Sequence, residues 1–140
     1  MSEATERDQS IETIRRELTA FARRARALAE RLHPGLSLVS YSLLAHMEER
    51  GGCRAADLAA YFLLDKSTVS RQIAALDRLG MVEREAEGQA RILRPTERGR
   101  AALADAARRQ REAFGDRLDE WSDADLADFA ASLVRYNAVE

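Results

Sequence analysis

The chain has 140 residues, which suits one domain or one domain with extended helical arms. Charged residues make up 33% and aromatic residues 6%, as in a helical protein with long solvated helices, and the net charge of −2 excludes a uniform attraction to nucleic acid. The single cysteine, Cys53, excludes an intrachain disulfide and fits a reducing compartment, and no apolar run is long enough for a membrane, so we expect a cytoplasmic protein.

A long helix is predicted near the start of the chain. Residues 1–9 are polar and are predicted to be disordered, Ser10 can cap the helix, and Pro34 ends it. Its apolar residues return at steps of three and four, which is either a helix packed on its own domain or, as we favour, a heptad seam that pairs with another chain. The predicted dimerisation residues on it are Ile11, Ile14, Leu18 and Phe21.

Two shorter helices are predicted next, over residues 36–50 and 54–62. Ser37 is the expected N-cap of the first, and Gly51 follows its last turn as a stop. The turn at Leu63 then leads into a further helix.

The helix predicted over residues 65–80 has two unlike faces. Asp65 is its expected N-cap, Gly80 its stop, and Val69, Ile73 and Leu76 form an apolar stripe. A short helix, a turn and an amphipathic helix make up a helix-turn-helix. The polar face carries the residues predicted to bind DNA: Lys66, Ser67, Thr68, Ser70, Arg71 and Gln72.

These side chains suit the major groove, where each base pair presents a distinct edge. Arg71 can bind guanine with two hydrogen bonds, and Gln72 can pair with adenine if it points into the groove. The short hydroxyl side chains let the helix come close, and Lys66, the only lysine, suits a phosphate. The other reading is a surface helix with an ordinary cap, which the helix-turn-helix frame disfavours.

A β-hairpin is predicted directly after this helix. Its strands cover residues 81–85 and 90–94, with the turn at 86–89. The arginines of this hairpin can contact the DNA backbone or the minor groove. They are Arg84, Arg91 and Arg94.

Two helices are predicted at the C-terminal end, one over residues 97–120 capped by Thr96 and one that starts at Ser122. The last helix has an apolar face predicted for dimerisation: Leu126, Phe129, Leu133 and Tyr136. The predicted fold is mainly α with a small β-hairpin wing. Residues 36–96 would form the winged helix-turn-helix lobe, and 10–35 with 97–140 the dimerisation region.

With this order of elements the chain resembles the MarR family of winged-helix regulators. The resemblance rests on Leu-Asp-Lys-Ser-Thr-Val-Ser-Arg at 64–71, Leu-Asp-Arg-Leu-Gly-Met-Val-Glu-Arg at 76–84 and Thr-Glu-Arg-Gly-Arg at 96–100. It implies a homodimer, a palindromic operator, and a ligand pocket between the dimerisation helices and the DNA-binding lobe.

The chain departs from the family pattern at the tip of the hairpin. The family places an arginine there for the minor groove, and this chain has Gln89. Either Arg91 takes over, or Gln89 reads the groove, or the wing contacts only phosphates.

Three residues near the expected pocket are candidates for binding a small aromatic or anionic effector: His33, Tyr41 and His46. For the two histidines, the favoured alternative is an ordinary packed or exposed side chain, because only their position suggests a ligand. They lack acidic partners at ligand spacing, so we expect no metal site and no cofactor. Cys53 is expected to be structural.

The function predicted is sequence-specific binding of double-stranded DNA by a homodimer that represses transcription and is released by a ligand. The alternative is a helical protein–protein interaction module that does not bind DNA. An enzyme is not expected, because the sequence has no nucleophile–base pair and no glycine-rich phosphate loop.

Overall fold

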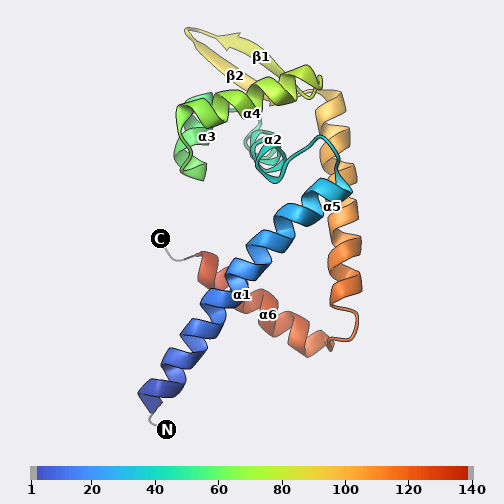
Figure 1. The fold of residues 1–140 in the computed structure, drawn as a ribbon. Helices are drawn as coiled ribbons and strands as arrows, with labels where there is room; N and C mark the ends of the chain where they lie inside the picture. Colours follow the sequence, from blue (N-terminus) through green and yellow to red (C-terminus); the bar gives the residue numbers. More distant parts are fainter. Residues whose placement is uncertain (1–2, 139–140) are drawn as a thin grey trace. The chain divides into compact units, whose positions relative to one another are not determined.

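The structure, a computed structural model, describes residues 3–138 (Figure 1). It contains six helices and one hairpin within this range. The elements in chain order are α1 (Glu3–Leu32), α2 (Leu38–Arg50), α3 (Ala55–Phe62), α4 (Lys66–Arg78), β1 (Val82–Glu87), β2 (Ala90–Pro95), α5 (Glu97–Arg117) and α6 (Asp123–Asn137). The chain divides into two compact units, Met1–Ala106 and Ala107–Glu140, so that the division falls within α5.

The first helix is longer than the sequence predicts. It begins at Glu3, so the predicted disorder was wrong for residues 3–9, and Ser10 lies inside the helix instead of capping it. Residues 1 and 2 lie outside the described part of the chain. The segment before Ile11 has no periodic apolar residues that would predict a helix. Extending an existing helix nevertheless costs little per residue, and acidic side chains near the N-terminus stabilise it through the helix dipole.

The core of the first unit is built by α2, α3, α4 and the hairpin. Figure 1 shows α4 crossing α2, with the hairpin beside it. The largest fully buried side chains come from three helices. They are Leu43, Leu44 and Met47 of α2, Leu58 of α3, and Val69 and Leu76 of α4.

The hairpin is longer and tighter than predicted. Its strands pair antiparallel from Val82 with Pro95 to Glu87 with Ala90, so that only Gly88 and Gln89 form the turn. Gly88 has a φ of 62°, a conformation that glycine adopts without strain at the first position of a two-residue turn. Pairing thus continues through residues that were predicted to be loop.

A backbone bridge anchors the hairpin to the end of α2. Cys53 donates its N–H to the Leu93 carbonyl at 3.1 Å and accepts the Leu93 N–H at 2.8 Å. The chain between α2 and α3 therefore adds one paired residue to the open edge of β2, and the hairpin is fixed to the core.

The second unit contains the rest of α5 and α6. Ser122 caps α6 by accepting the N–H of Asp125 at 3.1 Å, as predicted. The rings of Trp121 and Phe129 lie 5.4 Å apart, yet no residue of α6 is buried. None of the described helices is long and apolar enough to cross a membrane.

Candidate nucleic-acid interface

Helix α4 has one buried and one exposed face, as the sequence predicts. Val69, Ile73 and Leu76 are buried in the core of the first unit. On the outside, Thr68 is half-buried, and four side chains are exposed: Lys66, Ser67, Ser70 and Arg71. Hydroxyl and cationic groups therefore gather at the N-terminal half of a helix whose other face is fixed.

Asp65 caps this helix. Its Oδ1 accepts the backbone N–H of Thr68 and the hydroxyl of Ser67, both at 2.7 Å. The backbone N–H of Thr68, followed by the Ser67 hydroxyl, lowers the pKa of Asp65 to about 2. The carboxylate is therefore ionised at neutral pH and satisfies the first turn, while the Ser67 oxygen keeps its lone pairs for a further partner.

Arg71 projects from the exposed face one turn after the N-terminus. One of its Nη groups donates to Thr68 Oγ1 at 3.2 Å, which steers the side chain along the helix. A guanidinium carries five N–H donors, so most of them stay available for a base edge or a phosphate.

Gln72 does not lie on the outer face. Its Oε1 accepts the hydroxyl of Ser40, in the first turn of α2, at 2.6 Å and that of Ser37, the N-cap of the same helix, at 3.2 Å. The condition for pairing with adenine, that Gln72 points into the groove, is therefore not met in this structure.

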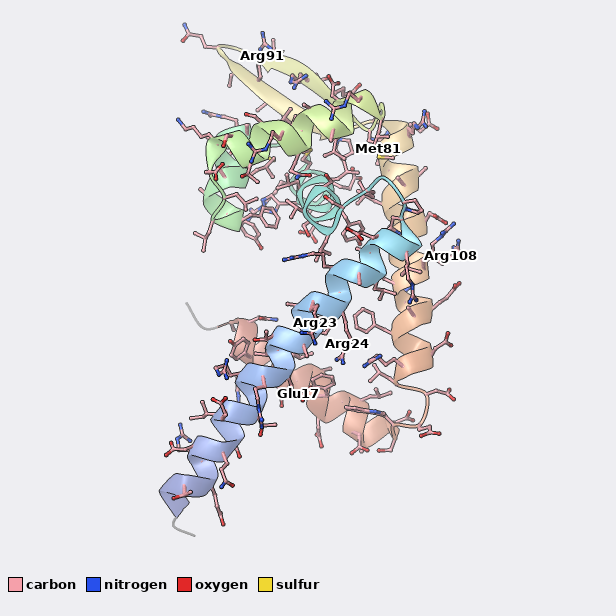
Figure 2. The ribbon with its side chains drawn as sticks, in the orientation of Figure 1. Glu17, Arg23, Arg24, Met81, Arg91 and Arg108 are labelled. Atoms are coloured by element: carbon pink, nitrogen blue, oxygen red, sulfur yellow. The ribbon has the colours of Figure 1, made fainter. Side chains whose placement is uncertain are left out.

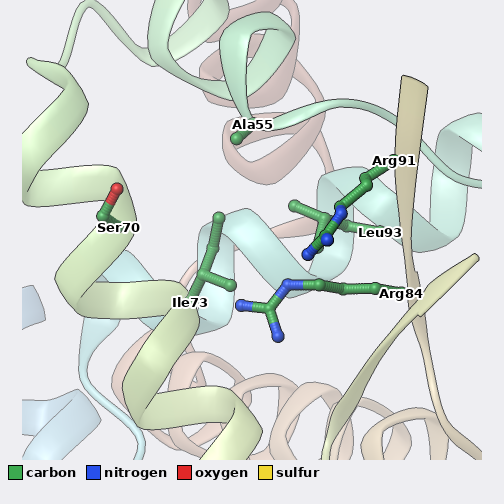
Figure 3. Close-up of a pocket in the computed structure, with 6 residues that line it drawn as sticks. All are labelled: Ala55, Ser70, Ile73, Arg84, Arg91 and Leu93. Carbon is green, nitrogen blue, oxygen red and sulfur yellow. The ribbon is translucent and has the colours of Figure 1, made fainter. Parts of the chain in front are cut away.

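Two arginines of the hairpin face α4. Arg84 of β1 and Arg91 of β2 lie on the strand face that also carries the buried Leu93. They line a hollow of about 190 Å³ together with Ser70 and Ile73 of α4, and in Figure 3 both guanidinium groups point into it. The hairpin thus places two guanidinium groups beside the middle of α4.

Arg84 also forms an ion pair with α4 that the sequence does not predict. Arg84 Nη1 lies 3.5 Å from Asp77 Oδ2, near the C-terminal end of α4. The two residues lie seven positions apart across a helix end and a turn, so neither helical nor strand spacing signals the contact.

Arg94 acts within the protein, unlike the predicted DNA contact. Its Nε lies 2.9 Å from Glu85 Oε2, and its Nη1 donates to the carbonyl of Gly51 at the end of α2. A Cβ on Gly52 would lie 3.0 Å from the Arg94 Nη1 and 2.7 Å from Ile92. Arg94 therefore joins the hairpin to the C-terminus of α2, and glycine at 52 leaves room for it.

The tip of the hairpin carries no arginine. Glu87, Gly88 and Gln89 are exposed there. Glu87 also belongs to the face opposite the two arginines, together with Glu83 and Glu85, because side chains alternate along a strand. The hairpin face toward α4 thus carries two arginines, whereas the opposite face carries three glutamates and only Arg94 as a cation.

The three predicted effector residues fall into two groups. His33 and Tyr41 stack with ring centroids 5.9 Å apart, and His33 is buried with its Nε2 unbonded to any described residue. His46 packs instead against Tyr61 at 4.2 Å and Phe62 at 5.5 Å, on α3. The structure brings only the first two together.

Cys53 is buried, and burial raises the pKa of its thiol, with a smaller contribution from Asp57. It therefore stays protonated at neutral pH and serves as a packed residue of the bridge to β2. Among residues 5–138, no three His, Cys, Asp or Glu side chains are grouped to hold a metal ion.

A helix-turn-helix followed by a hairpin that packs on its second helix defines a winged helix-turn-helix protein, the class of DNA-binding transcriptional regulators. Residues 35–92 match the model of the MarR family. The chain is also 35% identical, over 91% of its length and 92% of the relative's, to the uncharacterized HTH-type transcriptional regulator YxaD of Bacillus subtilis (strain 168). The chain belongs to the MarR family.

Solved structures agree on the fold. A MarR family protein from Bacillus stearothermophilus superposes with a TM-score of 0.81 at 19% identity, over 98% of this chain and 96% of that one. The crystal structure of MarR gives a TM-score of 0.80 at 21% identity, over 89% of this chain and 94% of that one. The predicted class, mainly α with a winged helix-turn-helix, is confirmed.

Proposed function

We propose that this regulator works as a homodimer that places two copies of α4 in successive major grooves of a palindromic operator and represses transcription there. The observation that carries the proposal is the outer face of α4, where Lys66, Ser67, Ser70 and Arg71 are exposed on a helix whose other side is buried. A face of hydroxyls and cations fits base edges, which both accept and donate hydrogen bonds, and phosphates, which accept them.

The roles we propose within this surface differ. Arg71 contacts a base, Lys66 a phosphate, and Ser67, Thr68 and Ser70 either of the two. Arg84 and Arg91 add phosphate contacts beside α4 from the face of the hairpin that they share. Gln89 lies at the turn of the hairpin and is the residue that we propose to contact the minor groove. In this assignment, α4 contributes more to recognition of the DNA sequence than the hairpin does.

Exposed apolar rows support the homodimer. On α1, Ile11 and Ile14 are each 53% exposed and Phe21 is 48% exposed, and Leu18 lies between them. On α6, Leu126 is half-buried, and the other three predicted residues, Phe129, Leu133 and Tyr136, are exposed. Rows of large apolar side chains in water are unfavourable, and a second copy of the chain would cover both of them symmetrically.

The pair His33 and Tyr41 supports a small-molecule effector. The two rings stack, and the buried ring nitrogen has no partner among the described residues, so it is the polar atom that we expect a small aromatic acid to bind. His46 has its own packing partners and is dropped from this site. A panel of phenolic acids should raise the melting temperature, and His33→Phe should abolish the rise; no shift with any acid contradicts the effector.

The proposal is tested by selecting DNA fragments from a random library with the purified full chain. We expect a palindrome whose half-sites lie about 34 Å apart, one helical turn. Arg71→Ala should weaken this fragment by about 1–3 kcal/mol and relax one base position, whereas Lys66→Ala should weaken all DNA alike. A chain that retards no fragment would favour the interaction module instead.

A further inference from the structure

We propose that Gln72 is a positioning residue that fixes the rotation of α4 about its own axis through two hydroxyl groups of α2. The inference rests on the proposed function, in which α4 reads DNA. Gln72 is half-buried between the buried stripe and the outer face of the helix.

The contact is a shared acceptor. Gln72 Oε1 accepts the Ser40 hydroxyl at 2.6 Å and the Ser37 hydroxyl at 3.2 Å. Ser40 is only 4% exposed, so its hydroxyl has little access to water. An unpaired buried hydroxyl is unfavourable, and the Ser40 hydroxyl therefore holds Gln72 in one orientation.

The apolar stripe decides which face of α4 is buried, but hydrophobic attraction itself has no preferred direction. A rotation of about 20° moves a group about 6 Å from the helix axis by about 2 Å. Recognition requires placement to within about 0.5 Å. The directional hydrogen bond that Ser40 donates to Gln72, the neighbour of Arg71, adds an angular constraint.

The same contact connects α4 to the turn before α2. Ser37 is the N-cap of α2 and accepts the Ser40 N–H at 3.1 Å while it donates to Gln72. The turn itself is closed by the N–H of Leu36, which donates to the carbonyl of His33 at 3.0 Å. A displacement of this turn would therefore be transmitted to α4 through the side chain of Gln72.

The test compares affinity for the selected operator with affinity for random DNA of equal length, by anisotropy titration of the full chain. Ser40→Ala and Gln72→Met should each lower the ratio of the two affinities by about 5- to 10-fold, the worth of one hydrogen bond. Ser42→Ala is the matched control, because that hydroxyl only donates to Leu38 O on its own helix, at 2.8 Å. It should leave the ratio unchanged.

The double variant decides between positioning and base reading. If Gln72 acts through Ser40, Gln72→Met should add little in the Ser40→Ala background. If Gln72→Met lowers the ratio but Ser40→Ala does not, Gln72 reads a base and the inference is overturned. Gln72→Glu keeps the acceptor oxygens and should preserve the ratio, while its charge weakens both affinities alike.

Urea unfolding of the same variants separates this inference from the proposed function. Non-additive losses of stability for Ser40→Ala and Gln72→Met would support the tie between α2 and α4 without reference to DNA. Additive losses would overturn it. A wild type that binds operator and random DNA equally would overturn the proposed function, and the unfolding cycle would still decide whether the tie exists.

Discussion

Gly99 in the first turn of α5 is the position where the addition of a single methyl group should disturb the fold most directly. A Cβ at Gly99 would lie 2.2 Å from the carbonyl oxygen of Met81 and 3.1 Å from its carbonyl carbon. Figure 2 labels Met81 where α4 ends and the hairpin begins. Because the obstacle is backbone and not a flexible side chain, α5 and the start of the hairpin would have to separate by about 1 Å.

The cost of Gly99→Ala can be worked from these contacts. Over-packing costs about 1–3 kcal/mol. The same Met81 oxygen accepts the N–H of Thr96 at 3.0 Å, and loss of that bond costs about 1 kcal/mol more. The better helix propensity of alanine offsets about 1 kcal/mol, so the net loss should be about 1–3 kcal/mol.

The assay is urea unfolding followed by circular dichroism, at one protein concentration because assembly affects stability. Gly115 is the matched control: it lies in the same helix, and a Cβ there meets nothing within 4 Å. Gly115→Ala should therefore stabilise the protein by about 0.5–1 kcal/mol. If Gly99→Ala were as stable as wild type while Gly115→Ala behaved as expected, the close contact with Met81 would be refuted.

Three further predictions concern the hairpin, the cysteine and the helix cap. Arg94→Met should lower the free energy of unfolding by about 1–2 kcal/mol, because the Gly51 carbonyl loses its hydrogen-bond partner. Arg91→Met should change the free energy of unfolding by no more than about 0.5 kcal/mol and should reduce the salt slope of DNA binding by about 1. Equal unfolding curves for the two variants would contradict a structural role for Arg94 and a DNA-binding role for Arg91. Cys53 should resist a thiol reagent at pH 8 in the native protein and react fully in urea, because it is buried with a raised pKa; rapid native labelling would count against this placement. The Asp65 carboxyl should titrate by NMR near pH 2. Its stabilising contribution is present above the unfolded pKa of about 3.9 and is lost as the pH falls through about 2, so a midpoint near 4 in the folded protein would show that the cap is not formed.

Local features of this fold could be predicted because their causes are local. The caps at Ser37, Asp65, Thr96 and Ser122 each depend on a hydroxyl or carboxylate and the N–H three residues on, and all four form. The buried stripe of α4 follows from helical spacing alone. Most of the outer face could be predicted for the same reason, although Thr68 and Gln72, which also lie outside the stripe, are half-buried.

The roles of Arg94 and Gln72 could not be predicted from the sequence. Arg94 meets a carbonyl 43 residues earlier, and Gln72 meets hydroxyls 32 and 35 residues earlier. Such contacts depend on how α2 packs, which residue spacing does not encode. A polar residue beside a DNA-binding stretch therefore has two possible directions, and only the fold chooses between them.

Three kinds of contact constrain α4, and their unequal strengths assign them different tasks. Burial of Val69, Ile73 and Leu76 contributes several kcal/mol and decides that the helix packs where it does. The exposed ion pair between Asp77 and Arg84 is worth at most about 1 kcal/mol. The hydrogen bonds of Gln72 add about as much again, yet they are directional and partly shielded from water. If Gln72 positions α4 as we propose, stability comes from the stripe, and the orientation of the outer face depends on weak polar contacts that a substitution can remove without unfolding the domain.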